Sequence, residues 1–248
     1  MFFIKKIILM LTILLFISGC LSNSSKQLTN NEGTLTVGVV PYVVPLSYYE
    51  NGKLTGFEID YANYLGNKLN LKVEFVPYEF KDILNAVENK EVDIAISCIT
   101  ITPERKKRVH FSRPYLKTGS VVAVFSTEEV SDISDFDGKK IGVLKGSVHE
   151  NYALEFKKVR NIEVITYNTQ SSLINGLKSN EVYAVIIDKI YLDSLKNDIP
   201  IKEAIVLDVQ YIGIASKLNT PILENINQVI LELEEDGTYK LLHEKWFQ

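Results

Sequence analysis

The chain has 248 residues, of which 46% are hydrophobic and 23% are charged, and its formal net charge is −4 at pH 7. This composition excludes general disorder, because it supplies enough apolar side chains for one large or two small hydrophobic cores. The slight acidic excess gives no basic surface for nucleic acid, and we expect no such partner.

The first twenty residues have the pattern of a secretory signal. Two lysines precede an apolar run over residues 7–17, which is too short to span a bilayer comfortably, and Ile-Ser-Gly-Cys ends the segment at Cys20. This ending resembles a lipobox, in which the cysteine is diacylated and becomes the mature N-terminus. We therefore predict a signal peptide over residues 1–19. Its removal takes away two lysines and changes the net charge from −4 to −6.

The predicted mature protein lies outside the cytoplasm, anchored to the outer face of the cytoplasmic membrane by lipid on Cys20. The alternative is an uncleaved membrane anchor, which would change the tether and not the compartment. Residues 20–33 are rich in Ser, Asn, Gln and Thr and have no apolar period, which is typical of a flexible tether. We expect folded structure to begin near Thr34.

The sequence offers little for redox or metal chemistry. With Cys20 lipidated, Cys98 is the remaining cysteine, so neither an intrachain disulfide nor a cysteine metal cluster can form. The three histidines are scattered, and none makes a ligand-spaced pair. We therefore expect no cofactor and no metal.

Strand and helix patterns alternate in both halves of the chain. In the first half, predicted strands cover residues 35–40, 71–76 and 92–96, and predicted helices cover 56–69 and 81–89. In the second half, predicted strands cover residues 140–144, 162–167 and 182–187, and predicted helices cover 149–157 and 171–178. This alternation is typical of open, mainly parallel sheets with helices on their faces.

An internal repeat divides the chain. "DILNAVENKEVDIAIS" at residues 82–97 and "SLINGLKSNEVYAVII" at residues 172–187 share a short helix, a polar turn and an apolar strand. Each half also opens with a similar strand, "LTVGVV" in the first and "KIGVLKG" in the second. The alternative is chance similarity between two generic αβ units, but two pairs of matches in the same order favour two lobes.

We therefore predict an α/β fold with two lobes, each an open, mainly parallel sheet flanked by helices. Two crossing strands, at residues 120–126 and 208–216, are predicted to join them. Lobe 1 is predicted to comprise residues 34–122 and 213–248, and lobe 2 residues 123–212. Open sheets of this type bind ligands beyond the carboxyl ends of their strands, so two facing lobes would enclose a cleft.

The stretch after the predicted strand at residues 92–96 has the composition of an anion site. Ser97, Cys98 and Thr100 follow the carboxyl end of the strand, and "TPER" then gives a helix start with a capping hydroxyl. Arg105 suits a carboxylate because its planar fork matches two oxygens. The three cations at residues 106–108 are interpreted as a solvated helix face.

With these residues the chain resembles the type II periplasmic amino-acid-binding proteins that feed ABC transporters, family 3 of the solute-binding proteins. The resemblance covers the chain from about Thr34 to the end. It is carried by "LTGFEIDYANYLG" (54–66), "EVDIAISCITITPERKKRVHFSRPY" (91–115), "KKIGVLKGS" (139–147) and "DGTYKLLHEKWF" (236–247). It implies a monomer that closes two αβ lobes on an amino acid or related small carboxylate, passes it to a membrane permease and performs no chemistry.

The resemblance also implies a set of ligand-binding residues. The carboxylate site of the family falls on Arg105, Thr100 and the backbone at Cys98, with Ser97 adjacent. The second lobe contacts the ligand at Leu144 and Ser147. Phe80 matches an aromatic that stacks on the ligand, and Asp188 matches an acid that holds its ammonium.

Three of these assignments have structural alternatives. For Phe80 the alternative is a core position, and for Asp188 it is a cap on the following helix. Cys98 departs from the usual small residue of the family, and its thiol either lines the pocket or is a small buried hydrophobe.

The sequence also departs from the family in the first lobe. The family often places an acid and an aromatic at the positions that here hold Val40 and Val43. One ammonium contact and one stacking face are therefore missing, with Tyr42 or Tyr48 as possible replacements for the aromatic. Because a buried cation needs its partners, we expect an apolar-sided ligand or one that is not a standard amino acid.

Two other functions are compatible with this fold. Some relatives are dehydratases of cyclic carboxylic acids that use an acid in the cleft, for which Glu150 or Glu79 could be nominated. The other is a ligand-sensing receptor that signals to a membrane kinase, although the sequence has no kinase and no second membrane segment.

Overall fold

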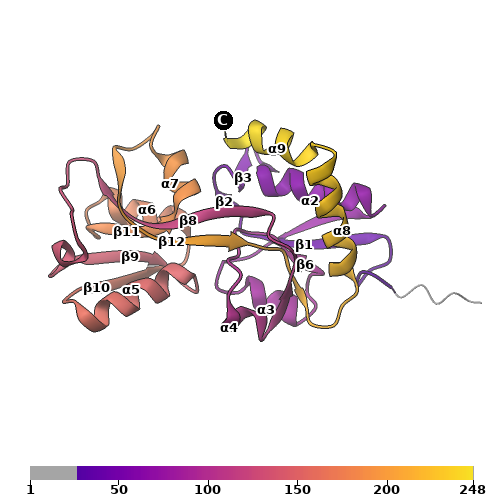
Figure 1. Cartoon of the computed structure of the whole chain (residues 1–248), viewed down its shortest axis with the longest axis horizontal. Helices are drawn as coiled ribbons and strands as arrows, with labels where there is room; N and C mark the ends of the chain where they lie inside the picture. Colours follow the sequence, from indigo (N-terminus) through magenta and orange to yellow (C-terminus); the bar gives the residue numbers. More distant parts are fainter. Residues whose placement is uncertain (1–26, 248) are drawn as a thin grey trace, which may run out of the picture.

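The computed structural model describes residues 27–247 and divides them into two lobes connected by two long strands (Figure 1). The predicted signal peptide and Cys20 lie outside the described residues. Among the helices described, none is both long and apolar enough to cross a membrane.

Lobe 1 contains a five-stranded sheet in the order β5-β1-β6-β13-β7. Its strands are β1 (Thr34–Val39), β5 (Lys72–Pro77), β6 (Ile94–Ala95), β7 (Val109–Phe111) and β13 (Ala215–Lys217). β1 pairs in parallel with β5 and β6, and β13 runs antiparallel to β6 and β7. The lobe also contains the helices α2 (Phe57–Lys68), α3 (Ile83–Glu88), α4 (Pro103–Lys106), α8 (Ile222–Glu235) and α9 (Thr238–Phe247).

Lobe 2 contains the second five-stranded sheet, in the order β10-β9-β11-β8-β12. Its strands are β8 (Leu116–Phe125), β9 (Lys140–Leu144), β10 (Glu163–Tyr167), β11 (Ala184–Asp188) and β12 (Ile201–Ile212). Its helices are α5 (Val148–Val159), α6 (Gln170–Lys178), α7 (Lys189–Leu195) and the 3₁₀ helix η1 (Ile133–Phe136). Both sheets are mixed. In the strand orders given, the first three strands of each sheet pair in parallel, and the remaining pairings are antiparallel.

The connection between the lobes is an antiparallel pair, β8 and β12, which runs across the middle of Figure 1. Their register extends from Ile201 opposite Phe125 to Ile212 opposite Leu116. β12 begins seven residues earlier than the predicted crossing segment at residues 208–216. The prediction missed its first part, "IKEAIVLD", because charged residues there interrupt the apolar pattern that identifies a strand. The end of that predicted segment is the separate strand β13 of lobe 1.

The internal repeat has a physical counterpart in the packing of the two lobes. A Cβ on Gly38 of β1 would lie 3.3 Å from Val92 and 3.5 Å from Ile83. A Cβ on Gly142 of β9 would lie 2.8 Å from Leu173 and 3.1 Å from Val182, which are the matching residues of the repeat. Each lobe thus uses a strand glycine so that the following αβ unit can pack closely on the sheet.

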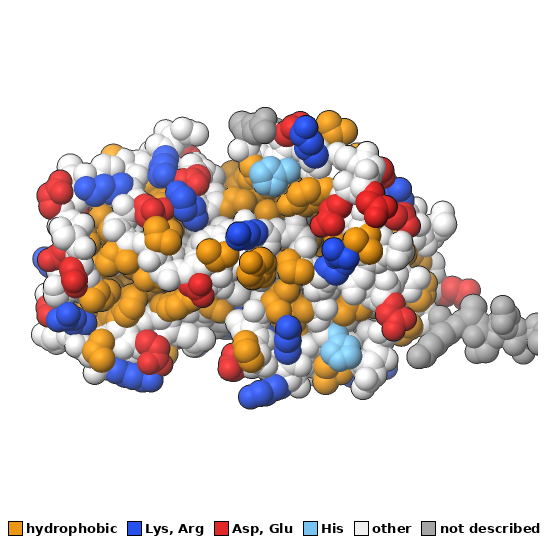
Figure 2. All heavy atoms as spheres, viewed as in Figure 1, with side chains coloured by type: hydrophobic (Ala, Val, Ile, Leu, Met, Phe, Trp, Pro, Cys, Tyr) orange, Lys and Arg blue, Asp and Glu red, His pale blue; other side chains and the backbone are white. Residues whose placement is uncertain are grey.

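Lobe 1 carries a small third sheet that the sequence patterns did not predict. It consists of β2 (Tyr42–Val43), β3 (Ser47–Glu50) and β4 (Lys53–Thr55) in antiparallel order. Figure 2 shows acidic and basic side chains interspersed over both lobes on the viewed face, with apolar side chains gathered where the lobes meet.

Candidate ligand-binding cleft

An enclosed cavity of about 30 Å³ lies between the two lobes. Lobe 1 lines it with Val40, Val43, Leu46, Ser47, Glu58, Phe80, Ser97, Cys98 and Thr100, and lobe 2 with Leu144, Ser147, Val148, His149, Gln170 and Asp188. This volume is room for roughly two water molecules. A larger molecule can therefore enter only when the lobes move apart.

The structure brings most of the predicted site residues to the wall of this one cavity. Those that line it are Phe80, Ser97, Cys98, Thr100, Leu144, Ser147 and Asp188. Arg105 lies beside it, in an adjoining cavity that it shares with Phe80 and Gly146.

Arg105 connects the two lobes. The Thr102 hydroxyl accepts a hydrogen bond from the Arg105 N–H at 3.2 Å and caps α4, as the sequence predicts. The guanidinium donates to the Thr100 carbonyl at 2.8 Å and to the Gly146 carbonyl of lobe 2 at 3.2 Å, and it lies 5.6 Å from the centre of the Phe80 ring. Burial lowers the pKa of Arg105 to about 10, so the side chain remains a cation at pH 7.

Two of the predicted carboxylate contacts are engaged within lobe 1. The Ser97 hydroxyl accepts from the Val40 N–H at 2.6 Å, and the Cys98 N–H donates to the Glu58 carboxylate at 2.6 Å. The Cys98 thiol lines the cavity and also packs against the core of lobe 1. Burial, followed by the charge of Asp188, raises the pKa of this thiol well above its usual range, so it is protonated and a poor nucleophile.

Glu58 is a buried acid of lobe 1 that the sequence reasoning missed. Its Oε1 accepts from the Cys98 N–H and also from the Tyr115 hydroxyl, and burial raises its pKa to about 7. A signal was present in the sequence, since Glu58 shares one helical face with Ala62 and Leu65 at spacings of four and seven residues. An acid on the apolar face of a helix is expected to serve a buried site.

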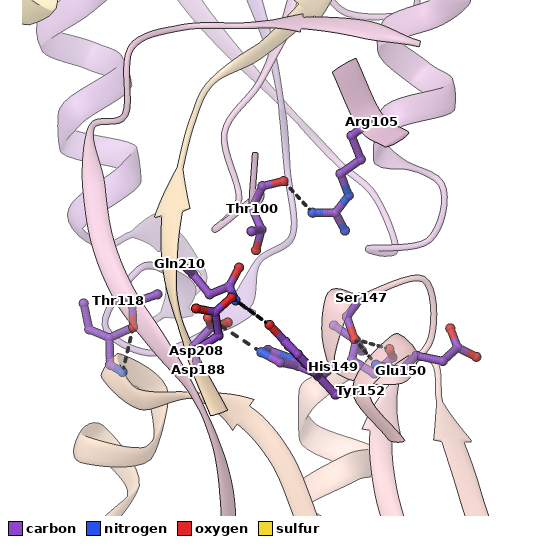
Figure 3. A network of polar contacts seen from close by, with 12 residues as sticks. Thr100, Arg105, Thr118, Ser147, His149, Glu150, Tyr152, Asp188, Asp208 and Gln210 are labelled. Atoms are coloured by element: carbon purple, nitrogen blue, oxygen red, sulfur yellow. Dashed lines mark hydrogen bonds and ion pairs between the residues drawn. The ribbon is translucent and has the colours of Figure 1, made fainter. Parts of the chain in front are cut away.

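Asp188 is the acid of lobe 2, at the end of β11. It occupies the position before α7, but its side chain makes no cap hydrogen bond to that helix. Burial raises its pKa to about 7, with Glu58 adding to the rise and with the neighbouring Cys98 thiol and Arg105 opposing it. His149 Nε2 lies 3.8 Å from Asp188 Oδ1 (Figure 3).

Two further polar residues of lobe 2, His149 and Gln170, line the cavity without having been predicted. Both stand in the first turn of a helix, in α5 and α6, behind the caps Ser147 and Thr169. The two residues are 3% and 5% exposed. Because polar residues near a helix start are usually solvated, spacing alone gave no reason to place them in a cleft.

The positions where the sequence departs from the family pattern form an aliphatic wall. Val40, Val43 and Leu46 line the cavity. Tyr42 is 47% exposed and does not line the cavity, and the Tyr48 ring instead packs edge-on against Trp246 at 6.4 Å. Neither tyrosine therefore supplies the stacking face that Val43 lacks.

The two acids nominated for an enzyme, Glu150 and Glu79, do not line the cavity. The Glu150 carboxylate accepts from the Gly146 N–H at 2.7 Å, and Glu79 pairs with Lys81 at 2.6 Å. Across residues 27–247 the structure also contains no group of three His, Cys, Asp or Glu side chains suited to a metal ion.

Comparison with known proteins gives a consistent result for the whole folded part. The L-cystine-binding protein TcyJ of Escherichia coli (strain K12) is 32% identical over 222 residues, which cover 87% of this chain and 83% of that protein. The arginine-binding extracellular protein ArtP of Bacillus subtilis (strain 168) is 26% identical over 249 residues, covering 95% and 97% of the two chains. These relatives are named as binding proteins and not as enzymes.

Solved structures show the same architecture. An ancestral arginine-binding protein bound to arginine superimposes with a TM-score of 0.83 at 36% identity, covering 88% of this chain and 99% of that one. AncCDT-1, an ancestral amino acid-binding protein and a precursor of cyclohexadienyl dehydratase, gives a TM-score of 0.80 at 32% identity, covering 87% and 96%. The predicted two-lobed α/β fold is thereby confirmed.

The sequence profile of bacterial extracellular solute-binding proteins, family 3, matches residues 35–248. This chain belongs to that family.

Proposed function

We propose that this protein captures an amino acid between its lobes outside the cytoplasm and delivers it to the permease of an ABC transporter. The observation that carries the proposal is the enclosed interlobe cavity, which has the Arg105 cation beside it and the buried Asp188 carboxyl in its opposite wall. An α-amino acid carries the two complementary charges on one carbon atom. A cation on one lobe and an acid on the other therefore suit it.

The carboxylate of the ligand would pair with the Arg105 guanidinium beside the Thr100 hydroxyl. To do so, the guanidinium would exchange its present carbonyl partners on Thr100 and Gly146 for the stronger carboxylate. Asp188 would accept the ammonium, and Phe80 would pack over the ligand between these two charges. Because Arg105 and Asp188 belong to different lobes, a ligand that satisfies both stabilises the closed arrangement.

The relatives support an amino acid over other small carboxylates. The L-cystine-binding protein and the arginine-binding proteins named above share at least a quarter of their residues with this chain over most of its length. "Probable histidine-binding protein" of Campylobacter jejuni matches at 26% identity over 94% of this chain. The ABC transporter arginine-binding protein 1 of Escherichia coli (strain K12) supports the transporter partner.

A thermal-shift screen tests the proposal. Protein lacking residues 1–20 is heated with each of the twenty amino acids and with small carboxylates that lack an amino group. A ligand present at 100 times its Kd stabilises the folded protein by about 2.7 kcal/mol, which is a shift of about 5–10 °C for a chain of this size. A shift with at least one amino acid is expected. Shifts only with carboxylates that lack an amino group would contradict the amino-acid assignment.

We further propose that Cys20 carries the lipid that anchors the mature protein. The lysines, the short apolar run and the Ile-Ser-Gly-Cys ending of the sequence support it. Cys20→Ala should release the protein from the membrane fraction of the native cells, and Cys98→Ala is the matched control that should not. A Cys20→Ala protein that stays firmly membrane-bound would indicate an uncleaved anchor.

A further inference from the structure

The lobe 2 wall of the cleft contains polar atoms that have no hydrogen-bond partner within the described part of the chain, although His149 Nε2 and Asp188 Oδ1 face each other at 3.8 Å. These atoms are both ring nitrogens of His149, Oε1 of Gln170 and Oδ1 of Asp188, and each is fully buried. Buried polar atoms in folded proteins are nearly always hydrogen-bonded, since leaving one unpaired is costly. A concentration of them around one cavity indicates that a bound molecule supplies the missing partners.

These groups are mainly acceptors of hydrogen bonds. Burial, with the charge of Arg105 adding to it, lowers the pKa of His149 to about 3, so the imidazole is neutral and offers one acceptor and one donor. Gln170 Oε1 and Asp188 Oδ1 are acceptors. In lobe 1, the hydrogen bonds to Glu58 are both made to Oε1, and within residues 27–247 its Oε2 has no hydrogen-bond donor.

The charged residues around the cavity further restrict which side chain the ligand can carry. Arg105 and Asp188 would be neutralised by the carboxylate and the ammonium of an amino acid, which leaves Glu58 as a second acid at the same cavity. A negative side chain on the ligand would be placed near two carboxyls. An apolar side chain would leave the acceptors of Glu58, His149 and Gln170 unpaired, which is unfavourable.

We propose that the ligand is an amino acid whose side chain carries N–H donors, either a cationic group or an amide, which Glu58, His149 and Gln170 receive. The inference rests on the proposed function. The aliphatic wall of Val40 and Val43 suits the methylene stem of such a side chain. Glu58, His149 and Gln170 suit the N–H donors at the end of that side chain. This assignment replaces the apolar-sided ligand that the two valines suggested in the sequence.

Calorimetric titration with shape-matched ligands tests the inference. Lysine is compared with norleucine, which lacks the terminal nitrogen, and arginine is compared with citrulline, which keeps N–H donors without the charge. Glutamine is the amide of the series, and glutamate is its shape-matched anionic counterpart. We expect lysine, arginine, citrulline or glutamine to bind about 10- to 100-fold more tightly than norleucine, and glutamate to bind more weakly than any of these four.

Two variants identify the residues responsible. Gln170→Leu removes the whole amide, and Glu58→Gln replaces one acceptor oxygen and the negative charge by an NH2 donor, both with little change of shape. Each should reduce the preference over norleucine at least about fivefold. The exposed pair Gln228→Leu and Glu224→Gln on α8 are matched controls that should leave it unchanged. Thermal unfolding of each variant without ligand establishes that it is folded, and a variant that has lost its cooperative transition is replaced by Gln170→Met or Glu58→Met, which also lack the oxygen acceptor.

The outcomes separate this inference from the proposed function. If amino acids bind but norleucine binds as tightly as lysine, arginine, citrulline and glutamine, the assignment of the side-chain class is wrong and the amino-acid function stands. The same conclusion follows if a preference exists and both cleft variants retain it. If no member of the series binds at any concentration tested, this inference fails, and the thermal-shift screen with the twenty amino acids then decides whether the proposed function stands.

Discussion

The two walls of the cleft are built on the same scaffold but are prepared for a ligand in different ways. In lobe 1, the Ser97 hydroxyl bonds to Val40, and Glu58 already accepts from Tyr115 and Cys98. In lobe 2, polar atoms of His149, Gln170 and Asp188 have no hydrogen-bond partner within residues 27–247. Most polar groups of the lobe 1 wall thus already have hydrogen-bond partners within the protein. The polar groups of the lobe 2 wall need hydrogen-bond partners from a ligand.

The repeat shows where this difference arises. With an offset of ninety residues between its copies, Cys98 of lobe 1 and Asp188 of lobe 2 hold equivalent positions, Cys98 three residues after β6 and Asp188 as the last residue of β11. In the folded protein the two side chains lie close enough that each shifts the pKa of the other. The same position of the repeat therefore supplies a thiol on one side of the cleft and a carboxyl on the other. The scaffold fixes where a side chain stands, and the residue type there decides what it binds.

The largest expected effect on ligand affinity comes from removing the planar guanidinium of Arg105 in lobe 1. Arg105→Lys should lower the affinity by several kcal/mol and below detection, because a lysine cannot make the two parallel hydrogen bonds of a guanidinium to a carboxylate. Isothermal calorimetry measures the affinity, and circular dichroism with thermal unfolding verifies the fold. An affinity close to that of the wild type would show that Arg105 does not hold the carboxylate.

Removing the acid of lobe 2 is expected to have the next largest effect. Asp188→Asn should cost about 2–5 kcal/mol of binding to an amino acid, because the ammonium is left without a charged partner in a desolvated cavity. The deaminated analogue of the same ligand should be nearly insensitive to this change. The comparison is made by calorimetry on both proteins. Equal losses for the two ligands would mean that Asp188 does not contact the amino group.

A smaller effect is expected from pH, again through the buried acids. In the free protein burial raises the pKa of Asp188 and that of Glu58 to about 7, and a bound cation favours the ionised forms. The complex then binds fewer protons than the free protein below pH 7. Affinity should therefore rise with pH up to about 7 and level off above it, by up to about tenfold per pH unit for each group.

Titrations between pH 5 and pH 8.5 measure this dependence. In Asp188→Asn the contribution of Asp188 to the pH dependence of the affinity should disappear. The pH dependence that remains should come from Glu58. His149 adds no slope in this range, since burial lowers its pKa to about 3. An affinity that is independent of pH, or that falls as pH rises to 7, would contradict a cationic contact to either acid.

The fold was largely predictable because the same pattern of strands and helices occurs in each lobe, and therefore twice in the chain. The strand predicted at residues 140–144 has those bounds in the structure, and the other strands and helices of the repeat differ by one or two residues at their ends. The β2–β4 sheet was not predicted, because strands of two to four residues carry too few side chains to show a period of two.

The cleft was predictable only in part. Ser97, Cys98 and Thr100 were identified because they follow a predicted strand and strand ends meet at the cleft, whereas Asp188 was identified through the family resemblance. Glu58, His149 and Gln170 reach the same cavity from the first turns of helices, where acidic and polar side chains are common for reasons of capping and dipole. For Glu58 the apolar helix face was a signal that the prediction missed. The role of His149 and Gln170 follows from tertiary packing, which buries them and which a single sequence does not show.

The smallest expected effect concerns a contact between the lobes away from the cavity. The Ser194 hydroxyl of α7 lies 2.9 Å from the Val44 carbonyl of lobe 1 and 2.8 Å from the Tyr191 carbonyl of its own helix. Ser194→Ala removes the interlobe bond and should favour the open arrangement by about 0.5–1 kcal/mol, because a hydrogen bond near solvent contributes little. Since the ligand binds between closed lobes, its affinity should fall about two- to fivefold, mainly through faster dissociation. Stopped-flow dissociation measures this, with Ser179→Ala, whose hydroxyl bonds within lobe 2 to Gly176, as the control without effect. If Ser194→Ala and Ser179→Ala change dissociation equally, the closure of the two lobes is held by the ligand and the cavity walls alone.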